Sequence, residues 1–195
     1  SPLRYPYEKP QATPQLQPSA ARSIHPLHEE GQAQMIIVLF GPMGCGKTTV
    51  GRILAARLGC RFYDADDYHS EANKQKMAAG VPLDDTDRKL WLKTLRQIIQ
   101  QHVDEKADMI LACSALKRKY RCLLGIDHDR IHGVYLKGSS ELLWKRIAAR
   151  SHEYMAPGLL QSQLETFEEP ENGLTIGIED SPLEICLTIE KQLVR

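Results

Sequence analysis

One eight-residue segment constrains this chain more than any other. It reads Gly41-Pro42-Met43-Gly44-Cys45-Gly46-Lys47-Thr48, which fits the pattern G-x-x-x-x-G-K-[ST], and it directly follows an apolar run at residues 35–40. The glycines allow backbone angles that turn successive N–H groups toward phosphate oxygens, and a helix that begins near Lys47 adds its positive N-terminal end. The sequence therefore predicts a strand, a phosphate-binding loop and a helix, in that order.

This loop predicts an ATP site at residues 41–49, which include Thr49. Lys47 would bridge the β- and γ-phosphates, and Thr48 would place its hydroxyl on Mg²⁺. Pro42 has no N–H, so it must lie where the loop needs no donor. Cys45, at a helix N-terminus beside Lys47, has two interpretations. It is either a reactive thiolate whose oxidation or alkylation blocks ATP, or an inert small side chain.

The rest of the chain alternates apolar strands with amphipathic helices. We expect strands at residues 35–40, 61–64, 109–113, 133–136 and 174–178. A helix is expected from residue 85 to about residue 103, because apolar side chains recur there at intervals of three and four. Another should begin at Ser181-Pro182-Leu183-Glu184, which supplies a capping hydroxyl, a proline at the first position and a capping-box glutamate. The pattern predicts an α/β fold of three layers, α/β/α, with a parallel sheet covered on both faces.

Composition sets the domain organisation and limits the partners. Residues 1–34 are rich in proline and glutamine without periodicity, so we expect a disordered tail before a domain at 35–195. The whole chain has 25 basic and 25 acidic residues, which argues against nucleic-acid and membrane partners. Five scattered cysteines without a C-x-x-C pair indicate reduced thiols in a cytoplasmic protein, with no zinc site.

A cluster of carboxylates follows the second predicted strand. The segment reads Phe62-Tyr63-Asp64-Ala65-Asp66-Asp67-Tyr68-His69. Ligands of open α/β sheets bind beyond the carboxyl ends of strands, so these groups should face the phosphate loop. If strand alternation sends Asp64 and Asp66 to the same side, one could hold a metal-bound water and the other a substrate hydroxyl whose proton it accepts. A solvated acidic turn that caps the next helix is the alternative.

A second charged cluster, Asp84-Asp85-Thr86-Asp87-Arg88, opens the long helix. Capping and dipole compensation explain the acidic residues. Arg88 is different, because a cation in the first turn opposes the helix dipole. A ligand carboxylate would account for Arg88, and so would a salt bridge to Asp84.

Several stretches together resemble the gluconokinase family, in that family's order and over residues 35–195. They are Phe62 to His69, Asn73 to Met77, Gly80-Val81-Pro82-Leu83, Asp85 to Arg88, Trp91-Leu92, Ala112-Cys113-Ser114-Ala115-Leu116-Lys117, Tyr120-Arg121, Leu159-Leu160-Gln161-Ser162-Gln163 and Glu169-Pro170. The resemblance implies ATP-dependent phosphorylation of D-gluconate on its 6-hydroxyl. It also implies a P-loop kinase fold similar to shikimate kinase, with a five-stranded parallel sheet, substrate-binding helices and a mobile lid, and it suggests a homodimer.

The resemblance also implies residue roles. Thr48 and Asp64 would serve Mg²⁺, and Asp66 would hold the reacting hydroxyl. The sugar acid would be recognised by His69, Arg88, Lys117 and Arg121. For Lys117 and Arg121, a solvated helix face is an equal alternative.

The lid departs from the family pattern. Arg146 and Arg150 are four residues apart on a predicted helix, so both could fold over the β- and γ-phosphates. The histidine that usually follows is displaced by one position to His152, and Glu153 adds a negative charge. Two alternatives to a gluconokinase stay open. One is a related kinase with another small acceptor, since no pattern in the sequence identifies the acceptor directly, and the other is a catalytically weakened nucleotide-binding homologue, which the altered lid would suit.

Overall fold

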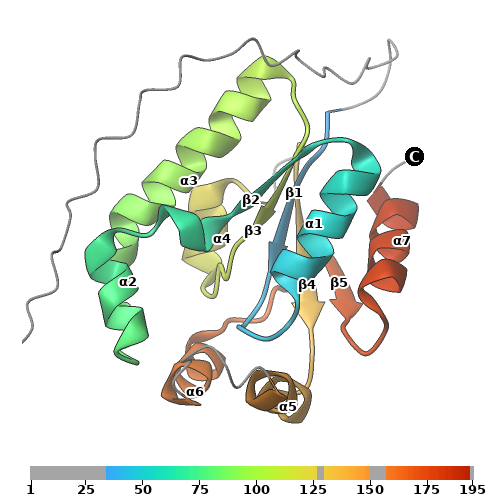
Figure 1. Ribbon diagram of the computed structural model, residues 1–195. Helices are drawn as coiled ribbons and strands as arrows, with labels where there is room; N and C mark the ends of the chain where they lie inside the picture. Colours follow the sequence, from blue (N-terminus) through green and yellow to red (C-terminus); the bar gives the residue numbers. More distant parts are fainter. Residues whose placement is uncertain (1–33, 127–129, 150–156, 194–195) are drawn as a thin grey trace, which may run out of the picture.

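The centre of the protein is a five-stranded parallel sheet (Figure 1). The computed structural model describes residues 34–126, 130–149 and 157–193. The strands are β1 (Ile36–Phe40), β2 (Arg61–Asp64), β3 (Met109–Ala112), β4 (Ile131–Lys137) and β5 (Leu174–Gly177), in the spatial order β2-β3-β1-β4-β5. All five predicted strands are confirmed, with ends within two residues of those expected. The proposed tail lies almost wholly outside the described residues.

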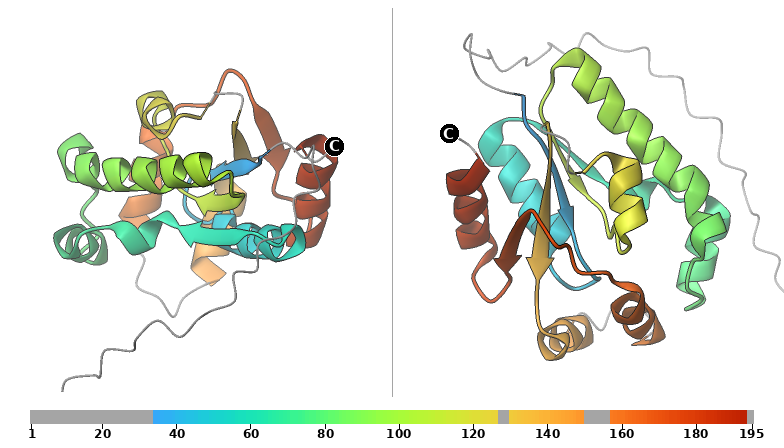
Figure 2. Two further views of the ribbon diagram at one scale, coloured as in Figure 1. Left: turned by 90° about the horizontal axis from the view of Figure 1, so that it is seen from above. Right: turned by 180° about the vertical axis from the view of Figure 1, so that it is seen from behind.

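Helices cover both faces of the sheet, as Figures 1 and 2 show. They are α1 (Lys47–Leu58) and α7 (Pro182–Leu193) on one face, and α3 (Asp85–Glu105) and α4 (Arg118–Leu124) on the other. Alternation along β1 produces this arrangement, since successive side chains of a strand point to opposite faces. Ile36, Val38 and Phe40 join the core with α3 and α4, whereas Ile37 and Leu39 join the core with α1 and α7. The three-layer prediction is therefore confirmed.

Helix starts agree with the sequence signals. At α3, the Asp84 carboxylate accepts from the Asp87 N–H at 2.8 Å, and the Asp87 carboxylate accepts from the Asp84 N–H at 3.1 Å. At α7, Ser181 and Glu184 form the expected capping box. The start of α1 is different, because its N-cap is Gly46, which offers no side-chain oxygen.

The remaining helices gather at the carboxyl ends of the strands, the edge where α/β sheets bind ligands (Figure 1). They are the 3₁₀ turn η1 (Ala65–Tyr68), α2 (Glu71–Ala78), α5 (Ser140–Ala149) and α6 (Pro157–Thr166). Among the helices that the structure describes, none has the length and apolar character needed to cross a bilayer.

Candidate active site

A pocket of about 1090 Å³ opens at this edge of the sheet. The phosphate loop, η1, the start of α3 and the helix α6 all contribute to its wall. The predicted site residues that line it are Met43, Gly44, Gly46, Lys47, Thr48, Thr49, Asp64, Asp66, His69 and Arg88. The fold therefore brings the predicted nucleotide side and the predicted acceptor side into one cavity.

The phosphate loop has the geometry of an anion cradle. Gly44 and Gly46 have φ angles of +83° and +97°, which side-chain-bearing residues rarely adopt. Lys47 Nζ donates to the carbonyls of Gly41 at 2.9 Å and Pro42 at 3.0 Å, so Pro42 serves the loop through its oxygen and needs no N–H. Because α1 has neither a capping side chain nor an acidic residue in its first turn, its N-terminal N–H groups fit an anionic ligand.

Cys45 lies behind the loop rather than in the pocket. Its side chain is fully buried, and Lys47 Nζ is 3.7 Å from its Sγ. A thiol reagent could reach the sulfur only if the loop opened. Burial therefore favours the inert interpretation over a reactive thiolate.

Thr48 and Asp64 meet across the pocket floor. Thr48 Oγ1 donates to Asp64 Oδ2 at 2.7 Å, while Asp64 Oδ1 accepts from the Asp66 N–H at 3.1 Å. The second bond caps η1, so Asp64 and Asp66 share the pocket because the chain turns directly after β2. The expectation that strand alternation aligns them was wrong. A hydroxyl beside a carboxylate supplies the hard oxygen ligands that Mg²⁺ prefers, so this pair fits that ion.

Asp66 projects into the pocket with 73% of its side chain exposed. Although most of the side chain is exposed, neighbouring protein atoms displace part of the water around the carboxyl and raise its pKa above the ordinary value. The positive charge of Lys47 opposes this rise, while the charges of Asp64 and Asp67 add to it. A carboxylate with a raised pKa is a better proton acceptor than an ordinary aspartate.

His69 closes the acceptor side of the pocket. Its ring is stacked on Trp91, with centroids 4.3 Å apart and planes 13° apart. Burial, followed by the charges of Arg88 and Lys74, lowers the pKa of His69 to about 4, so the ring is neutral near pH 7. Its Nδ1 is buried without a hydrogen-bond partner among the residues that the structure describes. Such an atom is suited to a ligand hydroxyl.

Arg88 also points to a ligand. Its guanidinium donates to the carbonyl of Leu83 and lies 5.6 Å from the ring centre of Tyr120, and the residue lines the pocket. Both of these partners are neutral, and among the described residues Arg88 forms no ion pair. The placement favours the interpretation that Arg88 binds a ligand anion.

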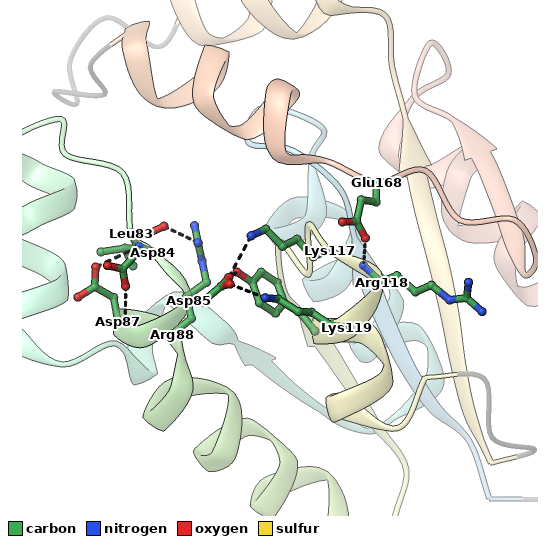
Figure 3. A network of polar contacts seen from close by, with 10 residues as sticks. Leu83, Asp84, Asp85, Asp87, Arg88, Lys117, Arg118, Lys119 and Glu168 are labelled. Carbon is green, nitrogen blue, oxygen red and sulfur yellow. Dashed lines mark hydrogen bonds and ion pairs between the residues drawn. The ribbon is translucent and has the colours of Figure 1, made fainter.

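Lys117 does not line the pocket and forms an ion pair with Asp85 instead. Figure 3 shows Lys117 and Lys119 converging on Asp85, at the start of α3. The Lys117 bond is 3.0 Å long, and the Tyr120 hydroxyl donates to the same carboxylate. Hydrogen bonds from Lys119, then Tyr120 and Lys117, hold the pKa of Asp85 below its usual range. In this structure Lys117 joins α4 to α3.

The position of Arg121 agrees with neither of its two expected roles, which were recognition of the sugar acid and a place on a solvated helix face. Its side chain is buried, and Nη1 donates to the carbonyls of Ala115 at 2.9 Å and Leu116 at 3.2 Å. Nη2 donates to the Glu168 carbonyl at 2.8 Å, and the guanidinium lies 5.2 Å from the Phe40 ring centre. Arg121 lines a separate hollow of about 290 Å³ instead of the main pocket. A solvated helix face is wrong for this residue, and its position does not support contact with the acceptor.

The lid arginines are described only in part. Arg146 Nη2 donates to the Ile178 carbonyl at 2.5 Å, and Nη1 lies beside Gly46, 3.9 Å from where a β-carbon would stand. Arg146 is therefore next to the loop without lining the pocket. Arg150, His152 and Glu153 lie outside the described residues.

Two residues with roles at the site were missed as site residues. Gln163 of α6 accepts a hydrogen bond from the Met43 N–H at 2.7 Å, which joins α6 to the phosphate loop. Its only signal was its place in the Leu-Leu-x-Ser-Gln segment. Trp91 was assigned to the core stripe of α3 and is indeed buried, but it also stacks on His69. Periodicity identifies a buried face and cannot tell which buried ring touches a site residue.

Comparisons with known proteins agree with this geometry. The family model described as "Shikimate kinase" matches residues 43–172. A protein named "Probable gluconokinase" from Mus musculus is 40% identical over 182 residues, which cover 83% of this chain and 99% of that protein.

Solved structures with the same fold include two sugar-kinase relatives. A sugar kinase from Janibacter sp. HTCC2649 has a TM-score of 0.75 at 33% identity and covers 82% of this chain and 94% of its own. A gluconokinase from Sinorhizobium meliloti 1021 has a TM-score of 0.70 at 30% identity, with 83% and 97% covered.

Proposed function

The chain belongs to the gluconokinase family, and we propose that its pocket transfers the γ-phosphoryl group of ATP to the 6-hydroxyl of D-gluconate. The observation that carries this proposal is the shared cavity: the phosphate loop with Lys47 lines the same pocket as Asp66, His69 and Arg88. A kinase needs both groups of residues, because it must hold a donor phosphate and an acceptor hydroxyl together.

On the donor side, the loop and the N-terminus of α1 hold the phosphates through backbone N–H groups. Lys47 exchanges its carbonyl partners for phosphate oxygens and stabilises negative charge as the phosphoryl group moves. Thr48 and Asp64 would hold Mg²⁺, which supplies charge neutralisation on the phosphates when bound. Arg146, beside the loop, and Arg150 would add positive charge from the lid.

On the acceptor side, Asp66 accepts a hydrogen bond from the 6-hydroxyl and then takes its proton. The hydroxyl oxygen forms a bond to the γ-phosphorus, the bond between that phosphorus and the β–γ bridging oxygen breaks, and ADP leaves. His69 pairs with another hydroxyl through Nδ1, which has no partner in the described part of the chain. Arg88 pairs with the carboxylate of the sugar acid.

A single assay tests the proposal. Mg-ATP-dependent ADP release is measured with gluconate, shikimate and AMP offered separately. Faster ADP release with gluconate alone supports the proposed reaction. Faster release with another acceptor indicates a related kinase, and no acceleration with any acceptor indicates a nucleotide-binding homologue without kinase activity.

Asp66→Asn then tests the mechanism. The variant should lose gluconate turnover and keep ATP binding, because the carboxylate serves the acceptor. Asp67→Asn is the matched control, since it removes a neighbouring carboxylate of η1 that has no proposed contact with the acceptor. Full turnover in Asp66→Asn would remove Asp66 from the mechanism.

Two further predictions concern the oligomeric state and the cellular location of the protein. Family resemblance suggests a homodimer, which light scattering of the purified protein would measure. Balanced charge and unpaired cysteines suggest a cytoplasmic location, which fractionation of the source cells would measure.

A further inference from the structure

We propose that Trp91 is a positioning residue for the acceptor, and that it fixes Asp66 and His69 relative to each other. This inference rests on the proposed function. Trp91 itself is not among the residues that line the pocket. It contacts both ends of the segment 65–69, which carries Asp66 and His69.

The first contact is with the backbone directly before Asp66. Trp91 lies near the start of α3 with 3% of its surface exposed, and its indole N–H donates to the Ala65 carbonyl at 2.7 Å. Ala65 is fully buried and is the first residue of η1. The bond therefore fixes the position of η1 relative to α3.

The second contact is with His69, directly after the same turn. The stacked rings are 4.3 Å apart, which holds the imidazole plane parallel to the indole. In this orientation His69 Nε2 lies 4.0 Å from Asp66 Oδ1, and the buried Nδ1 has no hydrogen-bond partner among the described residues. Rotation of His69 off the indole would change both relationships.

Asp66 depends on this support, because its own side chain is mostly exposed to water. Its backbone N–H is held by Asp64, and the preceding carbonyl is held by Trp91. Phosphoryl transfer to an alcohol is sensitive to such placement, since a misplacement of about 1 Å can cost on the order of 100-fold in rate.

A purely structural role is the competing explanation, because Trp91 is also part of the core. Leu95 provides the comparison. It lies one turn further along α3, is fully buried in the same core cluster, and belongs to neither contact described above. Loss of packing at Leu95 should lower stability without disturbing the acceptor groups.

The test therefore compares Trp91→Phe with Leu95→Ala at a temperature where both are folded. Trp91→Phe keeps an aromatic face and loses the indole N–H. We expect kcat with gluconate to fall about tenfold while the Kd for ATP stays within about twofold. Leu95→Ala should keep the kcat of the unaltered protein despite a lower Tm. An unchanged kcat in Trp91→Phe, or an equal loss of kcat in Leu95→Ala, would overturn the inference.

A spectroscopic measurement covers the case in which Trp91→Phe does not fold. The chain has two tryptophans, so Trp144→Phe leaves Trp91 as the sole indole. Gluconate bound at His69 should change the emission of Trp91 in a saturable way, and His69→Gln should remove that change. Constant emission in a variant that phosphorylates gluconate would contradict the inference. Absence of gluconate phosphorylation by the unaltered protein would instead refute the proposed function.

Discussion

Thr48 Oγ1 donates a hydrogen bond of 2.7 Å to Asp64 Oδ2, which joins the first turn of α1 to the end of β2. The two residues are sixteen positions apart in the chain and come from different elements. β3 lies between β1 and β2 in the sheet, so the carboxyl ends of these strands open onto the same edge. In the proposed function, this pair would hold Mg²⁺ beside the nucleotide.

Thr48→Ala tests that assignment. We expect gluconate turnover to fall about 100-fold and the Mg²⁺ concentration for half-maximal rate to rise, because the variant lacks one oxygen ligand. Initial rates over a Mg²⁺ series at fixed ATP measure both quantities. Thr188→Ala is the control, since that exposed hydroxyl on α7 donates to the Glu184 carbonyl of its own helix. An unchanged Mg²⁺ dependence in Thr48→Ala would exclude Thr48 from the metal site.

The phosphate side of the site was readable from the sequence because its determinants are local. The loop, the strand before it and the helix after it lie within residues 36–58, and glycine spacing together with Lys47 and Thr48 specifies the geometry. The five strands could be predicted for a similar reason, since a short apolar run between two amphipathic helices is typical of a buried strand.

The parts that could not be predicted depend on contacts between distant segments. Arg121 lies in the last turn of a short helix, where the sequence allows a solvated or a ligand-binding cation. Its partner Glu168 is forty-seven residues away. Gln163 and Met43 are separated by 120 residues. Periodicity carries no information about such pairs, so only the folded chain reveals them.

Activity should depend on pH through Asp66. This group works as a carboxylate, so turnover is lost as the pH falls through its pKa, and a raised pKa moves that loss above the ordinary aspartate value of 3.8. Asp67→Asn removes one of the charges that raise the pKa. The acidic limb of the kcat profile should therefore move to lower pH, with turnover at neutral pH retained. A limb that moves upward or stays fixed would contradict this assignment.

Gln163→Leu should weaken ATP binding about fivefold. The variant loses one hydrogen bond to the Met43 N–H, which is worth about 1 kcal/mol, and the phosphate loop loses its tie to α6. Titration calorimetry with ATP measures the effect. Gln161→Leu is the matched control, because Gln161 lies on the same helix and bonds the exposed Glu165. Tighter ATP binding in Gln163→Leu would mean that Gln163 competes with a phosphate for the loop.

Arg121→Met should reduce stability far more than it changes gluconate binding. The guanidinium serves the carbonyls of Ala115, Leu116 and Glu168, and Ala115 has a φ of +39°, a left-handed conformation that needs support. Loss of these bonds inside the protein should lower the free energy of unfolding by about 3 kcal/mol, measured by urea denaturation. Arg118→Ala, at an exposed residue 4.0 Å from Glu171, should change it by less than about 0.5 kcal/mol. If Arg121→Met instead keeps its stability and raises the KM for gluconate, Arg121 contacts the acceptor after all, and the loop around Ala115 must open when gluconate binds.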